Sequence, residues 1–309
     1  QGAGSVSMLI SESPSIISFN GSWGVSTKGI GDFFKPRRIF KRSNILIEAA
    51  KLLNKEISSN EAETLLATSD SKFWSDSNEI VEVYKEEPIF EGQFSNESYK
   101  ERVYEAIENF NEQNQRNILT DWENIIFHLP YAFHGRRMII NKWLDWMSEN
   151  DKIEEIYSEI GKPESNQDKD WIKKVSKSSL YKNFVENKIA PGEMASSEIG
   201  NMYTASIFMS LISSLVDAAN NDKKFEDKKI GFISYGSGSK AKIFEGTVQK
   251  NWIKKINTIK LFDGLNKRKK ISIDIYEKLH NRKITSNINN NDGVIKLNKI
   301  SDVGFQDVY

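Results

Sequence analysis

Runs of apolar residues divide the chain into predicted strands. Residues 125–127 are an unbroken apolar run, which predicts a buried strand, and residues 230–235 and 241–248 predict two more. A glycine-containing turn separates the last two, so we expect them to form a hairpin. Residues 5–10 and 15–19 predict another pair of short strands, joined by a turn into a buried hairpin.

Apolar residues at helical spacing predict helices between these strands. One helix is predicted over residues 96–113 and another over 132–147, followed by two polar helices up to about residue 187. A long helix is expected from residue 196 to about 219, and its apolar residues on more than one face indicate burial. The mixture of strands and buried helices favours an α/β layered fold.

Two segments lack this order. Residues 37–87 are charged and mixed, with weak helical periodicity, which we interpret as a peripheral insertion or lid. From about residue 267 the chain is basic and then Asn-rich, which is typical of a surface loop, before a last strand predicted at 294–297.

The charge balance and the cysteine count narrow the function classes. The 309 residues include 43 basic and 43 acidic side chains, so net charge offers no basis for binding nucleic acid or an anionic membrane. Without cysteine the chain can form no disulfide, thiolate zinc site or cysteine nucleophile. No apolar run approaches the ~20 residues that span a bilayer, and a soluble cytoplasmic protein is the default expectation.

His128 is the first candidate for chemistry, because it ends an apolar strand and precedes a Leu-Pro-Tyr turn. Ligands bind at this end of the strands in a parallel sheet, and an imidazole there suits acid/base work. The alternative is a hydrogen-bonded structural histidine. We interpret His134, on the following helix, and His280, in the polar tail, as structural.

Two further positions suit binding to an oxygen atom. Asn201 lies near the start of the long apolar helix, where its amide can donate to a carbonyl oxygen or orient an imidazole; the ordinary role of such a residue is to cap a helix or turn. Ser237 lies between Gly236 and Gly238, whose turn allows close backbone approach to a ligand. Hairpin turns use the same residues.

Arg136 and Arg137 lie on the helix that follows His128, and a guanidinium fork suits a phosphate or pyrophosphate. The alternative is a solvated helix face. No HExxH or EF-hand spacing occurs, so the sequence supports no metal site. The Tyr-Gly-Ser-Gly turn does not fit the nucleotide-binding glycine motifs.

Six segments together resemble one family. They are QGAGSVSMLI at 1–10, DFFKP at 32–36, EGQFSNESY at 91–99, FHLPY at 127–131, GNMYTAS at 200–206 and SYGSG at 234–238. In order and spacing they resemble the hydroxymethylglutaryl-CoA synthase family of the thiolase superfamily, over almost the whole chain. The resemblance is closest to bacterial forms with a long insertion after the Asp-Phe-x-x-Pro motif.

The resemblance implies a thiolase-like layered αβαβα fold, of which this chain holds the C-terminal portion and an incomplete N-terminal half. Residues 1–36 would be a remnant of the N-terminal half and residues 37–87 the insertion. Residues 88–309 would form the C-terminal half, with the CoA and acetoacetyl site. It also implies a homodimer and a place in the mevalonate pathway of isoprenoid biosynthesis.

The implied reaction is a Claisen-type condensation of acetyl-CoA with acetoacetyl-CoA, giving hydroxymethylglutaryl-CoA and free CoA. These CoA thioesters are substrates, and no further cofactor is implied. His128 and Asn201 match the histidine and asparagine that polarise the acetoacetyl carbonyl. The remaining expected site residues form two groups. The residues expected to bind the substrate are Ser237, Gly236, Tyr203 and Pro130. The residues expected to bind CoA are Arg136 and Arg137.

The chain departs from the family pattern in two respects. The family's nucleophilic cysteine and catalytic glutamate lie upstream of Gln1, and no cysteine exists here to replace the nucleophile, so the isolated chain cannot form an acetyl-enzyme. The family also tends to carry lysines five and nine residues beyond the histidine, where this chain has Phe133 and Arg137.

These departures leave several interpretations open. The chain is the C-terminal piece of a normal synthase in the first interpretation. In the second it pairs with another polypeptide that bears the cysteine and glutamate. In the third it is a degenerate, non-catalytic relative. One alternative function is a β-branching synthase of polyketide assembly, which would act on an acyl chain held by a carrier protein. Another is a non-catalytic acyl-CoA-binding or partner subunit.

Overall fold

The computed structural model describes residues 2–71, 74, 79–84, 87–165 and 168–284, and the backbone of the strand pair 299–300 and 307–308. The chain divides into two units, Gln1–Phe262 and Asp263–Tyr309. The candidate site residues all lie in the first unit.

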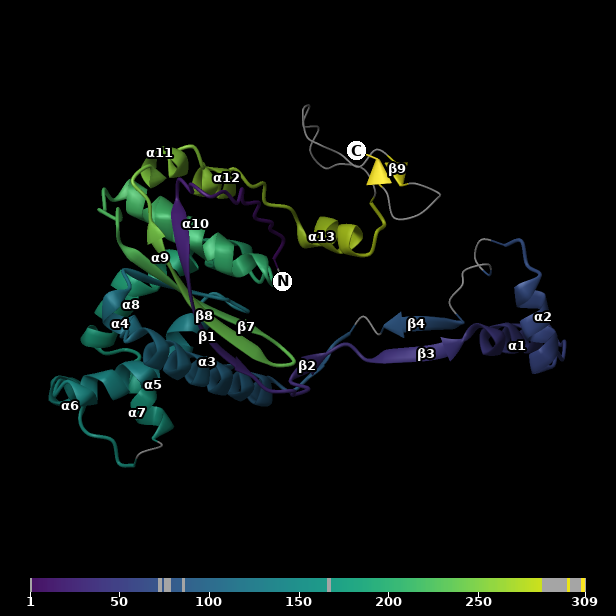
Figure 1. Ribbon diagram of the computed structural model, residues 1–309, viewed down its shortest axis with the longest axis horizontal. Helices are drawn as coiled ribbons and strands as arrows, with labels where there is room; N and C mark the ends of the chain where they lie inside the picture. Colours follow the sequence, from purple (N-terminus) through teal and green to yellow (C-terminus); the bar gives the residue numbers. More distant parts are fainter. Residues whose placement is uncertain are drawn as a thin grey trace. The chain divides into compact units, whose positions relative to one another are not determined.

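The first unit contains a four-stranded sheet in the order β1-β8-β7-β6 (Figure 1). Its strands are β1 (Ile17–Thr27), β6 (Asn124–Phe127), β7 (Lys229–Gly236) and β8 (Lys240–Val248). The β6–β7 pair is parallel, with Phe127 opposite Ile233, and the other pairs are antiparallel. The three strands predicted around residues 125, 230 and 241, and the hairpin that joins the last two, are confirmed.

Helices cover both faces of this sheet, because successive side chains of a strand point to opposite sides. Phe127 and Ile233 belong to an apolar cluster with α3 (Gly92–Asn114) and α5 (His134–Glu149). Ile126 and Phe232 belong to a second cluster, with α10 (Ala205–Asn220). Figure 1 shows α3 and α10 on the two sides of the β7–β8 hairpin. The α/β layered fold expected from the sequence is confirmed.

The prediction of one long helix over residues 196–219 was wrong. The segment contains the end of α9 (Ala190–Ile199) and most of α10, and a short linker separates them. Gly200 in this linker has φ +92°, a conformation that glycine adopts at no steric cost and that ends α9. Asn201 therefore lies in a loop between two helices.

The hairpin predicted at residues 5–10 and 15–19 was also wrong. Residues 2–16 contain no strand, and β1 begins at Ile17 and pairs with β8 instead. Val6 packs against the buried cluster that contains Met202 and Met209, but Leu9 and Ile10 are 96% and 90% exposed, so the end of the apolar run does not face a core. Near the chain start, the Gly2 N–H donates to Asn201 O at 2.8 Å, which ties this segment to the α9–α10 loop.

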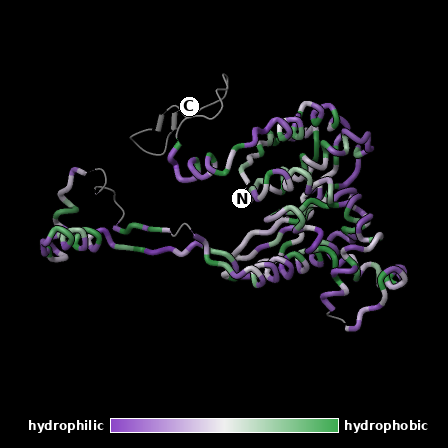
Figure 2. The backbone as a smooth tube through the Cα atoms, turned by 180° about the vertical axis from the view of Figure 1, so that it is seen from behind, coloured by the Kyte–Doolittle hydropathy of each residue, from purple (hydrophilic) through white to green (hydrophobic). Residues whose placement is uncertain are grey.

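The region interpreted as an insertion has its own short elements. β2 (Phe33–Phe34) pairs with β5 (Ile89–Phe90), and between them lie β3 (Arg37–Lys41), α1 (Arg42–Leu52), α2 (Ser59–Ala67) and β4 (Ile80–Tyr84). The two helices match the weak helical periodicity. Figure 2 shows hydrophobic and hydrophilic stretches alternating along this segment. The division into residues 1–36, 37–87 and 88–309 stays a prediction.

The remaining helices of the first unit are α4 (Ile118–Asp121), α6 (Ile153–Ile160), α7 (Lys169–Val175), α8 (Ser179–Lys188) and α11 (Trp252–Ile256). α12 (Leu261–Asn266) begins at the end of that unit, and the second unit contains α13 (Ile273–His280), β9 (Lys299–Ile300) and β10 (Asp307–Val308). The strand predicted at 294–297 lies outside the described residues. Among the helices of the described ranges, none is both long and apolar enough to cross a membrane.

Candidate active site

His128 lies immediately after β6, at the carboxyl end of the parallel strand pair. Its backbone N–H donates to Ile233 O at 2.9 Å, which extends the β6–β7 ladder by one residue. The Leu129 N–H donates to the Ser206 hydroxyl at 3.1 Å. The backbone at His128 is therefore held between β7 and the first turn of α10, at the edge where ligands bind in parallel sheets.

The imidazole of His128 is half-buried and hydrogen-bonded. Its Nδ1 lies 2.9 Å from Ser206 Oγ. Burial lowers the pKa of His128 to about 4, and a hydrogen bond to the Tyr203 backbone, which by itself would raise this pKa, offsets only part of the effect. At neutral pH the ring is therefore uncharged, with one N–H that can donate and one nitrogen that can accept.

Asn201 lies in the loop that also carries Tyr203. Its Oδ1 accepts the Tyr203 N–H at 2.7 Å, which is the turn-stabilising role of an asparagine. Tyr203 has φ +51° and is 52% exposed. Because the Asn201 amide oxygen is engaged, the amide NH₂ is the group that it can offer to a ligand. The hydrogen bonds of Tyr203 connect this loop to both Asn201 and His128.

The exposed turn that carries Ser237 joins β7 to β8. Gly238 in this turn has φ +121°, which favours glycine. The Gly238 N–H donates to Asp32 Oδ1 at 2.7 Å, and the Tyr235 hydroxyl donates to Asp32 Oδ2 at 2.5 Å. Burial, with the neighbouring carboxylate, raises the pKa of Tyr235 above its usual value. Asp32 is itself fully buried, so it anchors the turn from within.

Asp32 was not among the site residues expected from the sequence. The signal that could have identified it was its place at the head of the DFFKP segment. Tyr99 and Ser206 were not expected as site residues either, although Tyr99 ends the segment at 91–99 and Ser206 ends the segment at 200–206, which both carry the family resemblance.

Tyr99 on α3 joins the two parts of the site. Its hydroxyl donates to His128 O at 3.1 Å, and its ring lies 4.5 Å from the ring of Tyr235. Tyr99 is 2% exposed, and burial raises its pKa far above the usual value. The His128 backbone and the Ser237 turn are thus connected through Tyr99, Tyr235 and Asp32.

The two arginines of α5 have different surroundings. Arg136 Nε donates to Glu193 Oε2 at 2.9 Å, Arg136 Nη2 bonds the same oxygen, and the guanidinium lies over the Phe133 ring. Glu193 is 3% exposed, and burial raises its pKa against the opposing effect of Arg136. Arg137 is exposed, over the Tyr131 ring. Arg137 is therefore the more accessible of the two cations.

Pro130 is half-buried in the turn after His128. The structure thus brings His128, Pro130 and the Asn201 loop to one end of the sheet, and connects them through Tyr99 to the Ser237 turn. Within the described ranges, no group of three or more His, Asp or Glu side chains could hold a metal ion.

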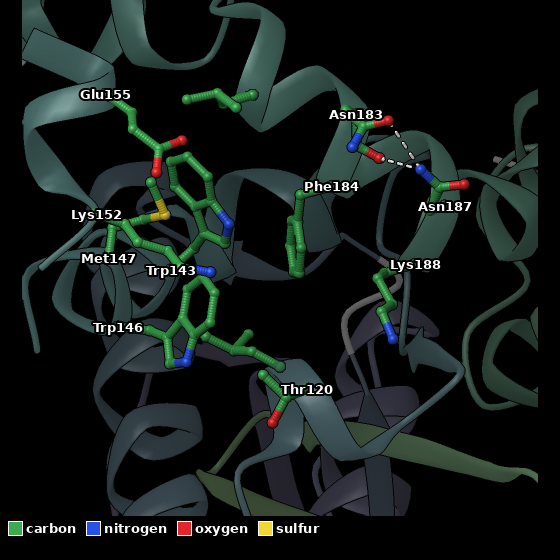
Figure 3. Close-up of a pocket in the computed structure, with 12 residues that line it drawn as sticks. Thr120, Trp143, Trp146, Met147, Lys152, Glu155, Asn183, Phe184, Asn187 and Lys188 are labelled. Carbon is green, nitrogen blue, oxygen red and sulfur yellow. Dashed lines mark hydrogen bonds between the residues drawn. The ribbon is translucent and has the colours of Figure 1, made fainter. Parts of the chain in front are cut away.

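A separate pocket of about 480 Å³ lies among α4, α5, α6 and α8 (Figure 3). The lining of this pocket includes the aromatic side chains Trp143, Trp146 and Phe184 and the basic side chains Lys152 and Lys188. None of the expected site residues lines this pocket, so it is distinct from the region around His128.

Comparison with known proteins identifies relatives over most of the chain. A family model described as "Hydroxymethylglutaryl-coenzyme A synthase C terminal" matches residues 81–299. The Haloferax volcanii hydroxymethylglutaryl-CoA synthase is 25% identical over 291 residues, which cover 91% of this chain and 55% of that protein. The Aspergillus fumigatus hydroxymethylglutaryl-CoA synthase erg13A is 28% identical over 218 residues, 63% of this chain and 45% of that protein.

Solved structures of the same group share the fold. MvaS in complex with 3-hydroxy-3-methylglutaryl coenzyme A has a TM-score of 0.61 at 20% identity, covering 96% of this chain and 59% of MvaS. The HMG synthase of the curacin biosynthetic pathway, in complex with apo donor-ACP, has a TM-score of 0.57 at 15% identity, covering 88% of this chain and 48% of that one.

The fold of the chain is thus the thiolase-like fold of these synthases. The chain spans about half the length of the curated relatives that it matches. Because the family model covers residues 81–299, including His128, Asn201 and Ser237, the chain belongs to the hydroxymethylglutaryl-CoA synthase family.

Proposed function

We propose that this chain forms the carbonyl-polarising and CoA-binding side of a hydroxymethylglutaryl-CoA synthase. The observation that carries the proposal is the uncharged His128 at the end of β6, hydrogen-bonded to Ser206 and connected through Tyr203 to the Asn201 loop. The reaction would condense acetyl-CoA with acetoacetyl-CoA. It would release CoA when the acetyl group is transferred, and hydroxymethylglutaryl-CoA after water cleaves the enzyme thioester.

His128 and Asn201 would act on the ketone of acetoacetyl-CoA. When the acetyl carbanion attacks this carbonyl carbon, the C=O electron pair moves to the oxygen, which becomes negatively charged. N–H donors from a neutral imidazole and an amide stabilise that charge, and one such donor is worth ~10²–10³-fold in rate. The low pKa of His128 keeps its ring neutral, and the one N–H of that ring would exchange its hydrogen bond to the Tyr203 backbone for one to the substrate oxygen.

The acyl-enzyme step needs a thiol that these 309 residues do not contain. In the family that the chain resembles, this cysteine, and the glutamate that deprotonates the acetyl methyl group, belong to an N-terminal segment of the synthase. We propose that this segment acts with the chain in cis or in trans.

The CoA side of the site would use the exposed Arg137 for a phosphate, because the Arg136 guanidinium is already paired with Glu193. The glycine-flanked Ser237 turn would approach the thioester, with Pro130 and Tyr203 beside the acyl group. Family membership supports the further proposals of a homodimer, a cytoplasmic location and a role in the mevalonate pathway.

A carrier-protein substrate is the second candidate. Phe133 is 47% exposed where the resemblance expects a lysine, and Glu193 neutralises Arg136, so fewer cations face a CoA phosphate. Structures of the curacin HMG synthase with donor-ACP share the fold. A β-branching synthase would need less of the CoA nucleotide site.

The proposal is tested by mixing the chain with the thiol-bearing N-terminal half of a family member and measuring condensation with acetoacetyl-CoA. We expect His128→Ala and Asn201→Ala each to lower the rate at least about 100-fold. His280→Ala, a change of the exposed histidine of α13, is the matched control and should keep the wild-type rate. Near-normal rates in both site variants would remove these residues from the mechanism. Turnover of an acyl carrier protein substrate alone would favour the second candidate.

A further inference from the structure

His134, the first residue of α5, is a buried histidine that the proposed chemistry does not use. It is 1% exposed, and neither Nδ1 nor Nε2 has a hydrogen-bond partner among the described residues. A buried polar group without a partner destabilises the folded state, so a role limited to filling space would be served better by an apolar side chain.

The contacts of the His134 ring are with two tyrosine rings. The Tyr99 ring lies 4.5 Å away at an interplanar angle of 87°, and the Tyr131 ring lies 4.6 Å away at 77°. In such edge-to-face pairs the positive edge of one ring meets the negative face of the other. Contact of an imidazole N–H with the π face of a tyrosine partly replaces the hydrogen bond that this N–H lacks. The flat shape of the imidazole is therefore what these contacts require.

Tyr99 transmits any displacement of His134 to both parts of the site. Its hydroxyl holds the carbonyl oxygen of His128, and its ring packs on Tyr235, whose hydroxyl is bonded to Asp32. Asp32 in turn holds the turn that carries Ser237. A shift of the Tyr99 ring would change the position of His128 relative to that turn.

The surroundings of His134 favour its uncharged form. The groups that face it are His128 from the loop after β6, Arg137 from its own helix, Tyr99 from α3 and Tyr131. None of these supplies a negative charge at neutral pH, and the N-terminal end of α5 carries the positive end of the helix dipole. A proton on the ring would also disturb its edge contacts with the tyrosines.

We propose that His134 is a positioning residue whose uncharged ring holds Tyr99, and through Tyr99 fixes His128 relative to the Ser237 turn. The inference rests on the proposed function only in treating His128 as the group that meets the substrate.

The test uses the small number of histidines. The chain has three, so ¹⁵N-histidine NMR resolves the ring nitrogens of His128 directly. His134→Phe keeps a flat ring, His134→Leu keeps bulk without a ring, and His280→Phe is the matched control. We expect His134→Phe to leave the His128 ring resonances at their wild-type positions. We expect His134→Leu to shift or broaden them in a protein whose circular dichroism shows it to be folded.

A second readout follows the reaction. With the thiol-bearing half supplied, we expect His134→Leu to lower kcat about tenfold or more, with KM for acetoacetyl-CoA nearly unchanged, because misplacement affects the transition state first. His134→Phe should restore kcat.

Unchanged His128 resonances in His134→Leu would overturn the inference, whatever happens to stability. Equal shifts in His134→Leu and His134→Phe would also overturn it, since ring shape would then not matter. Absence of condensation by the wild type would count against the proposed function, while the NMR result would still decide the role of His134.

Discussion

Acidification is expected to destabilise the protein through the buried His134 and the half-buried His128. Burial, together with repulsion by Arg137 and by His128 when it is protonated, lowers the pKa of His134 from an ordinary 6.5 to about 4. Between these two values the unfolded chain binds a proton at this side chain and the folded chain does not. Stability is therefore fully present above pH 6.5 and is lost as the pH falls toward 4.

The magnitude follows from the two pKa values. Each pH unit within the window contributes about 1.4 kcal/mol per histidine, so lowering the pH from 7 to 5 removes about 2 kcal/mol through His134. Burial also lowers the pKa of His128 to about 4, and this ring adds a similar share. The two together predict a loss of about 4 kcal/mol of unfolding free energy between pH 7 and pH 5.

Urea unfolding at pH 7, 6 and 5, followed by tryptophan fluorescence, measures this loss. All seven tryptophans precede residue 263, so the signal reports on the first unit. The His134→Phe variant has no titrating group at this position, so its stability should fall about 2 kcal/mol less than that of the wild type. The His280→Phe control should follow the wild type. Equal pH dependence in the wild type and His134→Phe would refute the reasoning.

Three further changes test other contacts. Asp32→Ala removes a buried carboxylate that accepts two hydrogen bonds, one of them from Gly238. Urea unfolding should therefore show a free energy of unfolding that is lower by about 2–4 kcal/mol. A loss below about 0.5 kcal/mol would show that Asp32 does not anchor the turn. Ser206→Ala should move the Nδ1 resonance of His128 in ¹⁵N NMR, since the hydroxyl is its partner; an unmoved signal would exclude that bond in solution. Arg137→Ala should weaken CoA binding about tenfold in calorimetry by removing a charge-assisted phosphate contact, and unchanged affinity would exclude Arg137 from the phosphate site.

Much of the fold was predictable because its signals are local. The apolar runs before His128 and on both sides of Ser237 mark β6, β7 and β8 by burial alone. The errors arose where an apolar run had two possible environments. Leu9 and Ile10 are exposed although their pattern resembles a strand, and Gly200 ends a helix inside a stretch that reads as continuous.

The contacts that define the site were not predictable in the same way, because they join residues far apart in the chain. Asp32 and Gly238 are 206 positions apart, and Arg136 and Glu193 are 57 apart. Neither pairing leaves a periodic trace, since each carboxylate meets its partner only after the sheet and its helices have formed.

The sequence by itself determined the class of fold, the place of His128 at the end of a strand, and the absence of any cysteine nucleophile among these 309 residues. Tertiary structure alone decided which arginine stays exposed, which acid holds the Ser237 turn, and that two of the three histidines are kept uncharged. The physical reason is that periodicity and composition depend on neighbours in the chain. Protonation, hydrogen bonding and exposure depend on the side chains that folding brings around each group.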